Sequence, residues 1–396
     1  MSRIDDLIAE YCPDGVERRP LGAIAKLYRG NGLQKKDFTD KGIGCIHYGQ
    51  IYTRYNTFTA QTISFVDKKL ADKLLKVHPN DLIVTATSEN LEDVCKAVAW
   101  LGESDIVTGG HSIVVRHHQN AKYLSYYFQT LDFFQRKRAY VHGTKVMEIK
   151  KDDLAKIAIP IPPLPVQEEI VRILDSFSSL EAELEAELET RRKQYAYYRN
   201  ELLSQSNLEA LDGRPIAKKT MGDLFDMKAG IHINGKLISE VENKEASIPC
   251  YGGNGIRGYV REANQTGTAL LIGRQGALCG NVCLASGAFY ATEHAVVTRC
   301  DDRLILPGYA FYMLTNRNLN QYKSAGAQPG LAVGKLRGIE FPVPSLATQQ
   351  KVVDILDRFD ALTTSLTDGL PAEIEARRKQ HEYYRDRLLS FDELAV

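Results

Sequence analysis

Several short stretches of this 396-residue chain interleave cationic, aromatic and amide side chains. Arginine can pair with guanine through two hydrogen bonds, asparagine and glutamine can do the same with adenine, and lysine neutralises phosphate. Glycine-rich turns among these stretches let a backbone approach a ligand closely. Structural loops have the same composition, so no single stretch is specific. The predicted contacts with nucleic acid are Lys35, Lys36, Tyr48, Gln50, Tyr52, Arg54, Tyr55, Lys145, Tyr251, Asn254, Arg257, Arg274, Gln275, Lys323 and Gln328.

The formal net charge of zero is a cancellation between regions of opposite sign. Residues 21–150 hold 18 Lys and Arg against 12 Asp and Glu, and residues 216–340 hold 14 against 10. Residues 161–210 hold only 5 against 10. The basic regions would attract phosphate-rich partners. The alternative is a random distribution of surface charge.

Residues that could perform catalysis form no recognised motif. The chain has no G-x-S-x-G or H-E-x-x-H sequence, and the segment Gly230–Leu237 has Leu237 where a phosphate-binding loop needs a hydroxyl for magnesium. The seven scattered cysteines form no zinc-ligand pattern and are expected to be reduced thiols. We therefore predict no catalytic residue and no bound metal or cofactor. His111 and His294 occupy matching places in the two halves, where either a base contact or a structural hydrogen bond is possible.

The elements that position these residues occur twice. Ile159–Gln167 matches Phe341–Gln349 at a shift of 182 residues. Arg191–Ser204 matches Arg377–Ser390 at a shift of 186, with ten of fourteen residues identical. A weaker likeness extends upstream into the region before each matched segment. Each half is therefore a variable region followed by a similar segment, which suggests one task performed on two different targets.

Periodicity distinguishes two kinds of region. Apolar residues recur three or four apart over residues 165–204 and 347–390, which predicts helices that start after proline clusters. Short β-rich runs over 81–85, 112–116, 270–273 and 295–298 predict mixed α/β regions with one helix each, near 122–137 and 307–321. The predicted domains are an N-terminal segment (1–20), two variable domains (21–158 and 215–340), a central helical segment (159–208) and a C-terminal helical segment (341–394).

A tetrad repeat runs through the first helical segment. Leu180, Leu184 and Leu188 align with Leu362, Leu366 and Leu370, and the second copy adds a further step to Ile374 before its Arg-Arg-Lys. One segment is therefore a tetrad longer than the other. We hypothesise that the number of tetrads acts as a ruler for the distance between two bound sites. The alternative is a solvated helix whose charges satisfy their own i,i+4 neighbours.

Two Pro-rich leads into Gln-x-x-hydrophobic helices, two Ile-Leu-Asp-x-Phe steps and two Arg-Arg-Lys-Gln-x-x-Tyr-Tyr-Arg motifs resemble the specificity subunit of type I restriction–modification systems. The resemblance covers essentially the whole chain. It implies an α+β fold class: two mixed α/β target-recognition domains separated by two long antiparallel, coiled-coil-like helices, with internal duplication and pseudo-two-fold symmetry. No individual base-contacting residue transfers from the family.

The resemblance also implies a function and partners. Each recognition domain would read one half of a bipartite double-stranded DNA target, while the helices set the spacer and dock other subunits. The chain would not be an enzyme; two modification subunits would methylate adenine with S-adenosylmethionine, and restriction subunits would use ATP and magnesium. The alternatives are a self-sufficient DNA-modifying enzyme and a coiled-coil scaffold for protein interaction.

The expected location is the cytoplasm. No apolar run approaches the roughly 18 residues that a membrane span needs, and the first ten residues lack the apolar stretch of a signal peptide.

Overall fold

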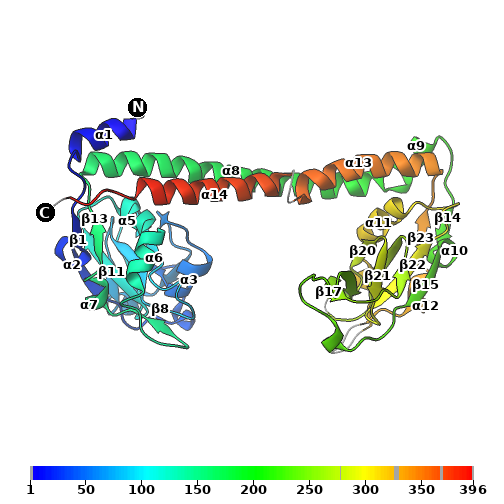
Figure 1. Ribbon diagram of the computed structural model, residues 1–396, viewed down its shortest axis with the longest axis horizontal. Helices are drawn as coiled ribbons and strands as arrows, with labels where there is room; N and C mark the ends of the chain where they lie inside the picture. Colours follow the sequence, from blue (N-terminus) through cyan, green and yellow to red (C-terminus); the bar gives the residue numbers. More distant parts are fainter. Residues whose placement is uncertain (1–2, 277, 325–329, 366–368, 395–396) are drawn as a thin grey trace. The chain divides into compact units, whose positions relative to one another are not determined.

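The chain folds into two compact units in the computed structural model, which describes residues 3–276, 278–324, 330–365 and 369–394. Unit 1 comprises residues 1–184 and 374–396, and unit 2 comprises residues 185–373. One helix, α8 (Leu164–Leu202), begins in unit 1 and ends in unit 2 (Figure 1). Each unit thus combines a variable globule with parts of both helical segments, so the domain limits expected from the sequence stay predictions.

Unit 1 contains a five-stranded sheet of order β2-β11-β7-β9-β4, a four-stranded sheet of order β5-β3-β10-β6, and the pairs β1-β13 and β12-β8. Its strands are β1 (Arg18–Pro20), β2 (Ala25–Arg29), β3 (Ile43–Ile46), β4 (Phe58–Thr59), β5 (Ser64–Val66), β6 (Leu75–Val77), β7 (Leu82–Thr85), β8 (Thr87–Ser88), β9 (Ala97–Trp100), β10 (Ile106–Thr108), β11 (Ser112–His117), β12 (Met147–Glu148) and β13 (Ala158–Pro160). Besides the first part of α8, its helices are α1 (Arg3–Tyr11), α2 (Leu21–Ile24), η1 (Lys35–Asp37), α3 (Tyr48–Thr53), α4 (Lys68–Ala71), α5 (Ala121–Tyr127), α6 (Leu131–Lys137), α7 (Lys151–Leu154) and most of α14 (Leu370–Leu388).

Unit 2 contains two four-stranded sheets, of order β15-β22-β19-β20 and β17-β16-β21-β18, and the pair β14-β23. Its strands are β14 (Lys218–Thr220), β15 (Phe225–Ala229), β16 (Ile248–Gly252), β17 (Gly255–Val260), β18 (Gln265–Thr266), β19 (Ala269–Gly273), β20 (Val282–Ala285), β21 (Ala288–Ala291), β22 (Ala295–Cys300) and β23 (Glu340–Pro342). Besides the second part of α8, its helices are α9 (Gln205–Asp212), α10 (Met221–Leu224), η2 (Gly235–Leu237), α11 (Pro307–Asn316), η3 (Leu319–Tyr322), α12 (Val333–Arg337) and α13 (Leu346–Thr364).

The four β-rich runs predicted from the sequence are confirmed as the central strands of the two units. They correspond to β7, β11, β19 and β22. All four residues of β7 and all five of β19 are buried, as expected for short apolar runs covered on both faces. In both units the central pair is antiparallel, β7 with β11 and β19 with β22, so the internal duplication is confirmed at the level of strand pairing.

The duplicated glutamine of the Pro-rich motif joins each long helical segment to its globule. Gln167 is fully buried, donates from Nε2 to the Pro162 carbonyl (2.7 Å) and accepts from the Asn120 amide (3.0 Å). Gln349 makes the same pair of bonds, to the Pro344 carbonyl (2.9 Å) and from the Leu306 amide (2.8 Å). Asn120 and Leu306 precede α5 and α11, so the motif fixes helix to globule in both units.

The aspartate of each Ile-Leu-Asp-x-Phe step accepts a hydrogen bond from a buried tyrosine. Tyr126 of α5 donates to Asp175 (2.9 Å), and Tyr312 of α11 donates to Asp357 (2.5 Å). Burial raises the pKa of both phenols, so each remains a donor. These bonds explain why the motif recurs while the surrounding surface varies.

Within each unit two helices pack against each other antiparallel. In unit 1 the ring of Phe177 in α8 stacks on His381 (5.7 Å) and Tyr384 (5.4 Å) of α14. His381 Nδ1 also lies 2.8 Å from Glu181 Oε1, so contacts move down one helix as they move up the other. In unit 2 Phe359 of α13 stacks in the same way on Tyr195 (6.5 Å) and Tyr198 (5.9 Å) of α8.

Two of the expected helical segments each consist of two helices in the structure. The second segment is two helices, because α13 ends at Thr364 and α14 begins at Leu370, where Gly369 and Pro371 interrupt a continuous helix. The helix expected near 122–137 is also two, because Thr130 caps α6 by accepting from the Phe133 amide (3.2 Å). In unit 2, Asn318 adopts a left-handed conformation (φ 50°) between α11 and η3. The helix over 165–204 is confirmed as α8, which has 39 residues.

The tetrad leucines lie along α8 with their side chains partly buried. Leu180, Leu184 and Leu188 are of intermediate exposure. In the second copy Leu362 is 41% exposed, Leu370 is of intermediate exposure, and Ile374, the additional step, is buried. Leu366 lies outside the described residues. The charges of this stretch include two i,i+4 pairs, Arg191–Glu187 and Lys193–Glu189, as the solvated-helix alternative expects.

Candidate DNA interface

Three segments of unit 1 meet at one edge of its sheets: the end of β3, the end of β7 and the loop before β11. The hydroxyl of Thr87 lies 2.8 Å from Nδ1 of His111, and the ring of Tyr48 lies 4.7 Å from the His111 ring. Tyr52 donates from its hydroxyl to the Thr87 carbonyl (2.5 Å). Tyr48, Tyr52, Thr87 and His111 are called the Tyr48 cluster below. His111 is exposed while its Nδ1 is held by Thr87, so its ring is fixed at the surface.

The predicted lysines of η1 lie close to this cluster. Lys35 and Lys36 are both exposed. Burial, and after it the positive charge of Lys35, lowers the pKa of His47, whose ring contacts that of Tyr48 (4.5 Å). The neutral His47 caps α3 by accepting from the Gly49 amide (3.2 Å). The structure therefore brings a cationic turn and an aromatic surface together, although 12 residues separate Lys36 and Tyr48 in sequence.

Two of the residues predicted as contacts in this region hold α3 in place. Gln50 accepts from the His47 amide (3.0 Å) and donates to the Ser64 hydroxyl (2.7 Å), so both ends of its amide are engaged. Tyr55 is 7% exposed, and its hydroxyl accepts from the Ile63 amide (2.9 Å). This burial argues against Tyr55 as a DNA contact, because Tyr55 follows the end of α3 and packs in the core with Ile46 and Ile51. Tyr52 is half-buried, and burial raises its pKa to about 12.

Two further cations predicted in unit 1 lie in the solvent. Arg54 follows α3 as its C-cap, and Lys145 lies in the turn that precedes β12; both are exposed. Strand β12 pairs with β8, which carries Thr87, so Lys145 belongs to the loop next to the strand that holds the Tyr48 cluster.

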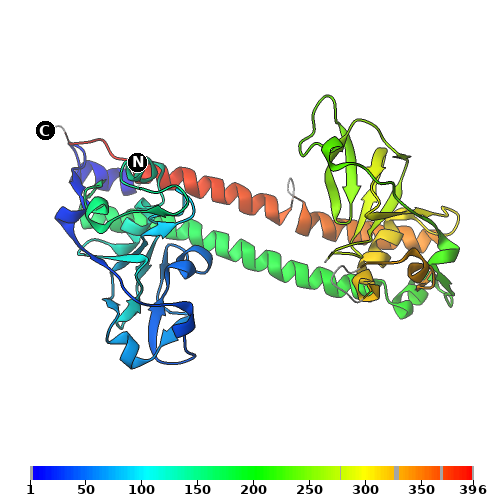
Figure 2. The same cartoon turned by 90° about the horizontal axis from the view of Figure 1, so that it is seen from below.

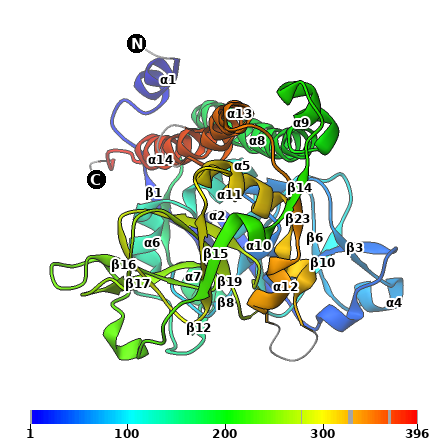
Figure 3. The same ribbon diagram turned by 90° about the vertical axis from the view of Figure 1, so that its right-hand side faces the viewer.

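In unit 2 three predicted contacts lie on the β16–β17 hairpin. Tyr251 is partly buried and its ring packs edge-on against Phe289 (5.9 Å). Asn254 is exposed at the turn, where its Oδ1 accepts from Asn281 (2.8 Å). Arg257 is exposed. Its Nη2 lies beside Gly235 of η2, 3.6 Å from the position that a Cβ of this residue would occupy. Figures 2 and 3 show this hairpin at the rim of unit 2.

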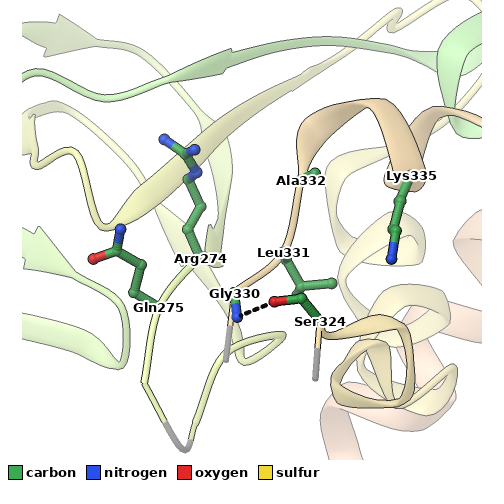
Figure 4. Close-up of a pocket in the computed structure, with 7 residues that line it drawn as sticks. All are labelled: Arg274, Gln275, Ser324, Gly330, Leu331, Ala332 and Lys335. Atoms are coloured by element: carbon green, nitrogen blue, oxygen red, sulfur yellow. Dashed lines mark hydrogen bonds between the residues drawn. The ribbon is translucent and has the colours of Figure 1, made fainter. Parts of the chain in front are cut away.

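Arg274 and Gln275 line a cavity of about 240 Å³ in unit 2. The other lining residues are Ser324, Gly330, Leu331, Ala332 and Lys335 (Figure 4). None of these seven side chains is acidic, and two are cationic. Arg274 donates from Nη1 to the Glu293 carbonyl (3.4 Å), while Lys335 extends from the opposite wall. Lys323 is exposed next to Ser324, and Gln328 lies outside the described residues.

The duplicated histidine is held differently in unit 2. His294 Nε2 lies 3.3 Å from Oε1 of Glu293, which also lies 2.9 Å from Nδ1 of His232. Burial works to raise the pKa of Glu293, but the His232 hydrogen bond and the charges of both histidines outweigh it and lower the pKa. In unit 2 the carboxylate of the preceding residue therefore contacts Nε2 of the histidine, whereas in unit 1 the Thr87 hydroxyl contacts Nδ1. Both interpretations of His111 and His294, base contact or structural bond, stay predictions.

Sequence reasoning did not select Thr87, Lys236 or Lys335. Lys236 is exposed on η2 and is the counterpart of Lys36 at a shift of 200, the shift that also relates β2 to β15. That alignment was a usable signal for Lys236. No comparable signal marks Thr87 or Lys335, because their roles depend on strands that pair over long separations.

No group of three or more His, Cys, Asp or Glu side chains in the described ranges could hold a metal ion. Among the helices within the same ranges, none is long and apolar enough to cross a membrane.

Comparison with known proteins identifies the family. The family description "Type I restriction modification DNA specificity domain" matches residues 13–190 and again residues 214–376. The chain therefore belongs to the family of type I restriction–modification specificity subunits. The two matches cover both copies of the internal repeat, which agrees with the resemblance inferred from the motifs.

Curated relatives carry the corresponding names. The chain is 47% identical over 262 residues to the type I restriction enzyme EcoprrI specificity subunit of Escherichia coli. That match covers 62% of this chain and 63% of the relative, so it spans less than two thirds of that protein. The EcoR124I/EcoR124II specificity subunit of Escherichia coli is 33% identical over 68% of this chain and 70% of its own length.

Solved structures support the fold. The specificity subunit of Mycoplasma genitalium matches 94% of this chain and 96% of its own, with a TM-score of 0.54 and 19% identity. A chain from a structure titled as complex assembly and conformational transition of the type I restriction–modification system matches with a TM-score of 0.62 and 15% identity. It covers 96% of this chain and 98% of its own.

Proposed function

We propose that this chain is the DNA-reading subunit of a type I restriction–modification complex, and that each unit reads one half of a bipartite target. The observation that carries the proposal is that the two units attach to their helices in the same way but differ at their exposed sheet edges. The same buried glutamines and tyrosine–aspartate bonds hold both globules, while the Tyr48 cluster of unit 1 is replaced by a glycine-rich hairpin in unit 2. Such an arrangement suits one task performed on two different base sequences.

The electrostatics favour a phosphate-rich partner for both globules. Lys35 and Lys36 in unit 1, and Lys236 and Lys335 in unit 2, are exposed cations next to the candidate reading surfaces. Contacts of this kind position a protein on the DNA backbone, whereas base edges supply the sequence preference. Affinity should therefore fall steeply as the salt concentration rises.

The chain itself supplies recognition rather than chemistry in this proposal. The partner subunits would hold S-adenosylmethionine, ATP and magnesium, and would perform adenine methylation and DNA cleavage. The absence of a catalytic motif from the sequence supports this division of roles, as do the names of the relatives. Adenine methylation needs the base turned out of the duplex into a methyltransferase pocket, which belongs to another subunit.

Two docking faces for modification subunits follow from the duplicated Arg-Arg-Lys-Gln-x-x-Tyr-Tyr-Arg motif. Tyr197 in α8 and Tyr383 in α14 occupy the same motif position, and each is 60% exposed. Large aromatic side chains with a polar tip are enriched in protein interfaces. One copy in each unit fits two identical partner subunits, and the restriction subunits would join through them.

Mapping methylated adenines genome-wide tests the proposal, in cells with and without this gene. We expect one bipartite motif to lose methylation completely when the gene is deleted, and to regain it when the gene is restored. Purified chain that methylates or cuts DNA without partners would instead identify a self-sufficient enzyme. DNA affinity with little salt dependence and no sequence preference would identify a protein scaffold.

A further inference from the structure

Units 1 and 2 contain the same pair of neighbouring strands at their candidate DNA-reading edges. Strand β3 pairs antiparallel with β5 and parallel with β10, and β16 pairs antiparallel with β17 and parallel with β21. A single bridge outside the sheets confirms the match: Thr39 joins Phe65 in unit 1, and Ser239 joins Tyr259 in unit 2. Strands β5 and β17 are therefore structural counterparts.

The connection within this strand pair differs completely. In unit 1 residues 47–63 join β3 to β5 and form α3 and β4. In unit 2 only Gly253 and Asn254 join β16 to β17, and Gly255 follows with φ 86°. A two-residue turn with a left-handed glycine makes a tight β-hairpin, so unit 2 presents a two-stranded ribbon where unit 1 presents a short helix.

The tip of the ribbon carries side chains that can read DNA and no acidic residue. Residues 248–260 contain Arg257 but neither Asp nor Glu. Within the part of the chain that the structure describes, Arg257 makes no hydrogen bond or ion pair, and Lys236 of η2 adds a second exposed cation nearby. Ile256, an apolar side chain, is 55% exposed. An exposed isoleucine on an edge strand costs free energy in water and suits contact with the C5 side of a pyrimidine.

We propose that unit 2 reads its half-site with the β16–β17 hairpin laid in the major groove, where Arg257 contacts a base edge and Ile256 packs against a pyrimidine. This inference rests on the proposed function and names the element that reads. The major groove, about 12 Å wide, admits a two-stranded ribbon. Gly255, which is partly exposed beside the turn, lacks a side chain that would keep the backbone from the groove floor, whereas Gly252 and Gly258 are buried.

The test compares Arg257→Ala, Arg257→Lys and Ile256→Ser with wild type in cells that carry the full complex, by mapping methylated adenines. Arg257→Ala should relax the motif at one base pair of one half-site, with discrimination falling about 10- to 100-fold. Arg257→Lys keeps the charge but not the two-pronged hydrogen bonding, so it should relax the same position. Ile256→Ser should weaken a neighbouring position of the same half-site. Arg317→Ala, at an exposed arginine that caps α11, is the matched control and should leave the motif intact.

Binding of the full chain to a duplex of the motif, measured against salt concentration, provides the second readout. If Arg257→Ala weakens binding equally for all sequences and reduces the salt slope by about one, Arg257 contacts a phosphate and the inference is overturned. A motif that changes in the other half-site, or in neither, also overturns it. Failure of the proposed function is distinguishable, because wild type itself would then direct no bipartite methylation.

Discussion

Units 1 and 2 each have a backbone carbonyl at the equivalent turn, and different side chains donate the hydrogen bond to it. In each unit the chain turns back through a left-handed residue, Cys95 (φ 68°) or Gly280 (φ 91°), whose amide donates to the end of the central strand. The carbonyl just before it accepts from Lys137 in unit 1 (2.6 Å) and from Asn320 in unit 2 (2.7 Å).

The contacts between globule and helix behave differently. There the same residue types recur in both units: Gln167 with Gln349, and the tyrosine–aspartate pairs of α5 and α11. Between the two units, the loops share a hydrogen-bond geometry but not the residues that make it. The contacts between globule and helix share both the geometry and the residue types. A globule can therefore change its loops and reading edge without changing how it attaches to its helices.

Removing the two donors, the Lys137 ammonium and the Asn320 carboxamide, should give the largest effect on stability. Lys137 is 3% exposed and also donates to the Glu92 carbonyl (3.0 Å), so Lys137→Ala leaves one buried and one partly buried carbonyl without this donor and opens a cavity. We expect a loss of about 3 kcal/mol in the free energy of unfolding, against about 1–2 kcal/mol for Asn320→Ala. Urea denaturation measures both. Fluorescence reports unit 1, because Trp100 is the only tryptophan, and circular dichroism follows the whole chain.

Lys137→Met is the control for that experiment, since it keeps the length of the side chain and removes only the ammonium group. It should recover the part of the loss that comes from the cavity. Equal losses in the free energy of unfolding for Lys137→Ala and Asn320→Ala would contradict this explanation, in which the buried charge makes the Lys137 bond contribute more to stability than the Asn320 bond.

Acidification should lower the stability of unit 1 through a histidine that unit 2 lacks. The expected loss in the free energy of unfolding is smaller than that for Lys137→Ala. Burial lowers the pKa of His117 to about 4, and the matching residue in unit 2 is Cys300, whose thiol pKa burial raises to about 12. The unfolded chain binds a proton at His117 near pH 6.5, whereas the folded chain does not until about pH 4. The stability that neutral His117 supplies is therefore complete above pH 6.5 and is lost as the pH falls toward 4, by about 2 kcal/mol at pH 5.

Trp100 fluorescence during urea denaturation at pH 7 and pH 5 measures this loss. His117→Asn removes the titration and keeps an acceptor for the Gln119 amide, which donates to His117 Nδ1 (3.1 Å). Its pH dependence between 7 and 5 should be flatter than that of wild type. An unchanged pH dependence would assign the acid sensitivity of unit 1 to other groups.

Deleting one tetrad from α8 should change stability least of these variants, but it tests the ruler hypothesis directly. Deleting Glu185–Leu188 removes one tetrad from α8, shortens the helix by about 6 Å and turns its far end by roughly 40°. If the tetrads act as a ruler, the methylation motif should keep both half-site sequences and change the spacer between them. A length-preserving control, Leu184→Met with Leu188→Met, should leave the spacer alone. If genome-wide mapping of methylated adenines finds the same spacer in cells that carry the deletion variant, the ruler hypothesis is wrong.

The sequence by itself determined the repeated frame. The proline clusters, the apolar period of α8 and the four β-rich runs depend on neighbours a few residues away, so they were predicted within a few residues. The matched motifs also located the residues that attach globule to helix, although not the bonds they make. The resemblance drawn from those motifs led to the family.

Only the tertiary structure decided which of the predicted side chains are accessible and which are buried. Tyr48 and Tyr55 have the same composition around them, yet one contacts His111 at the surface and the other lies in the core. The helix of unit 1 and the hairpin of unit 2 likewise arise between equivalent strands from unlike connections. The physical reason is that burial and strand register are set by partners tens of residues away, such as Thr87 for His111, whereas periodicity and capping are set locally.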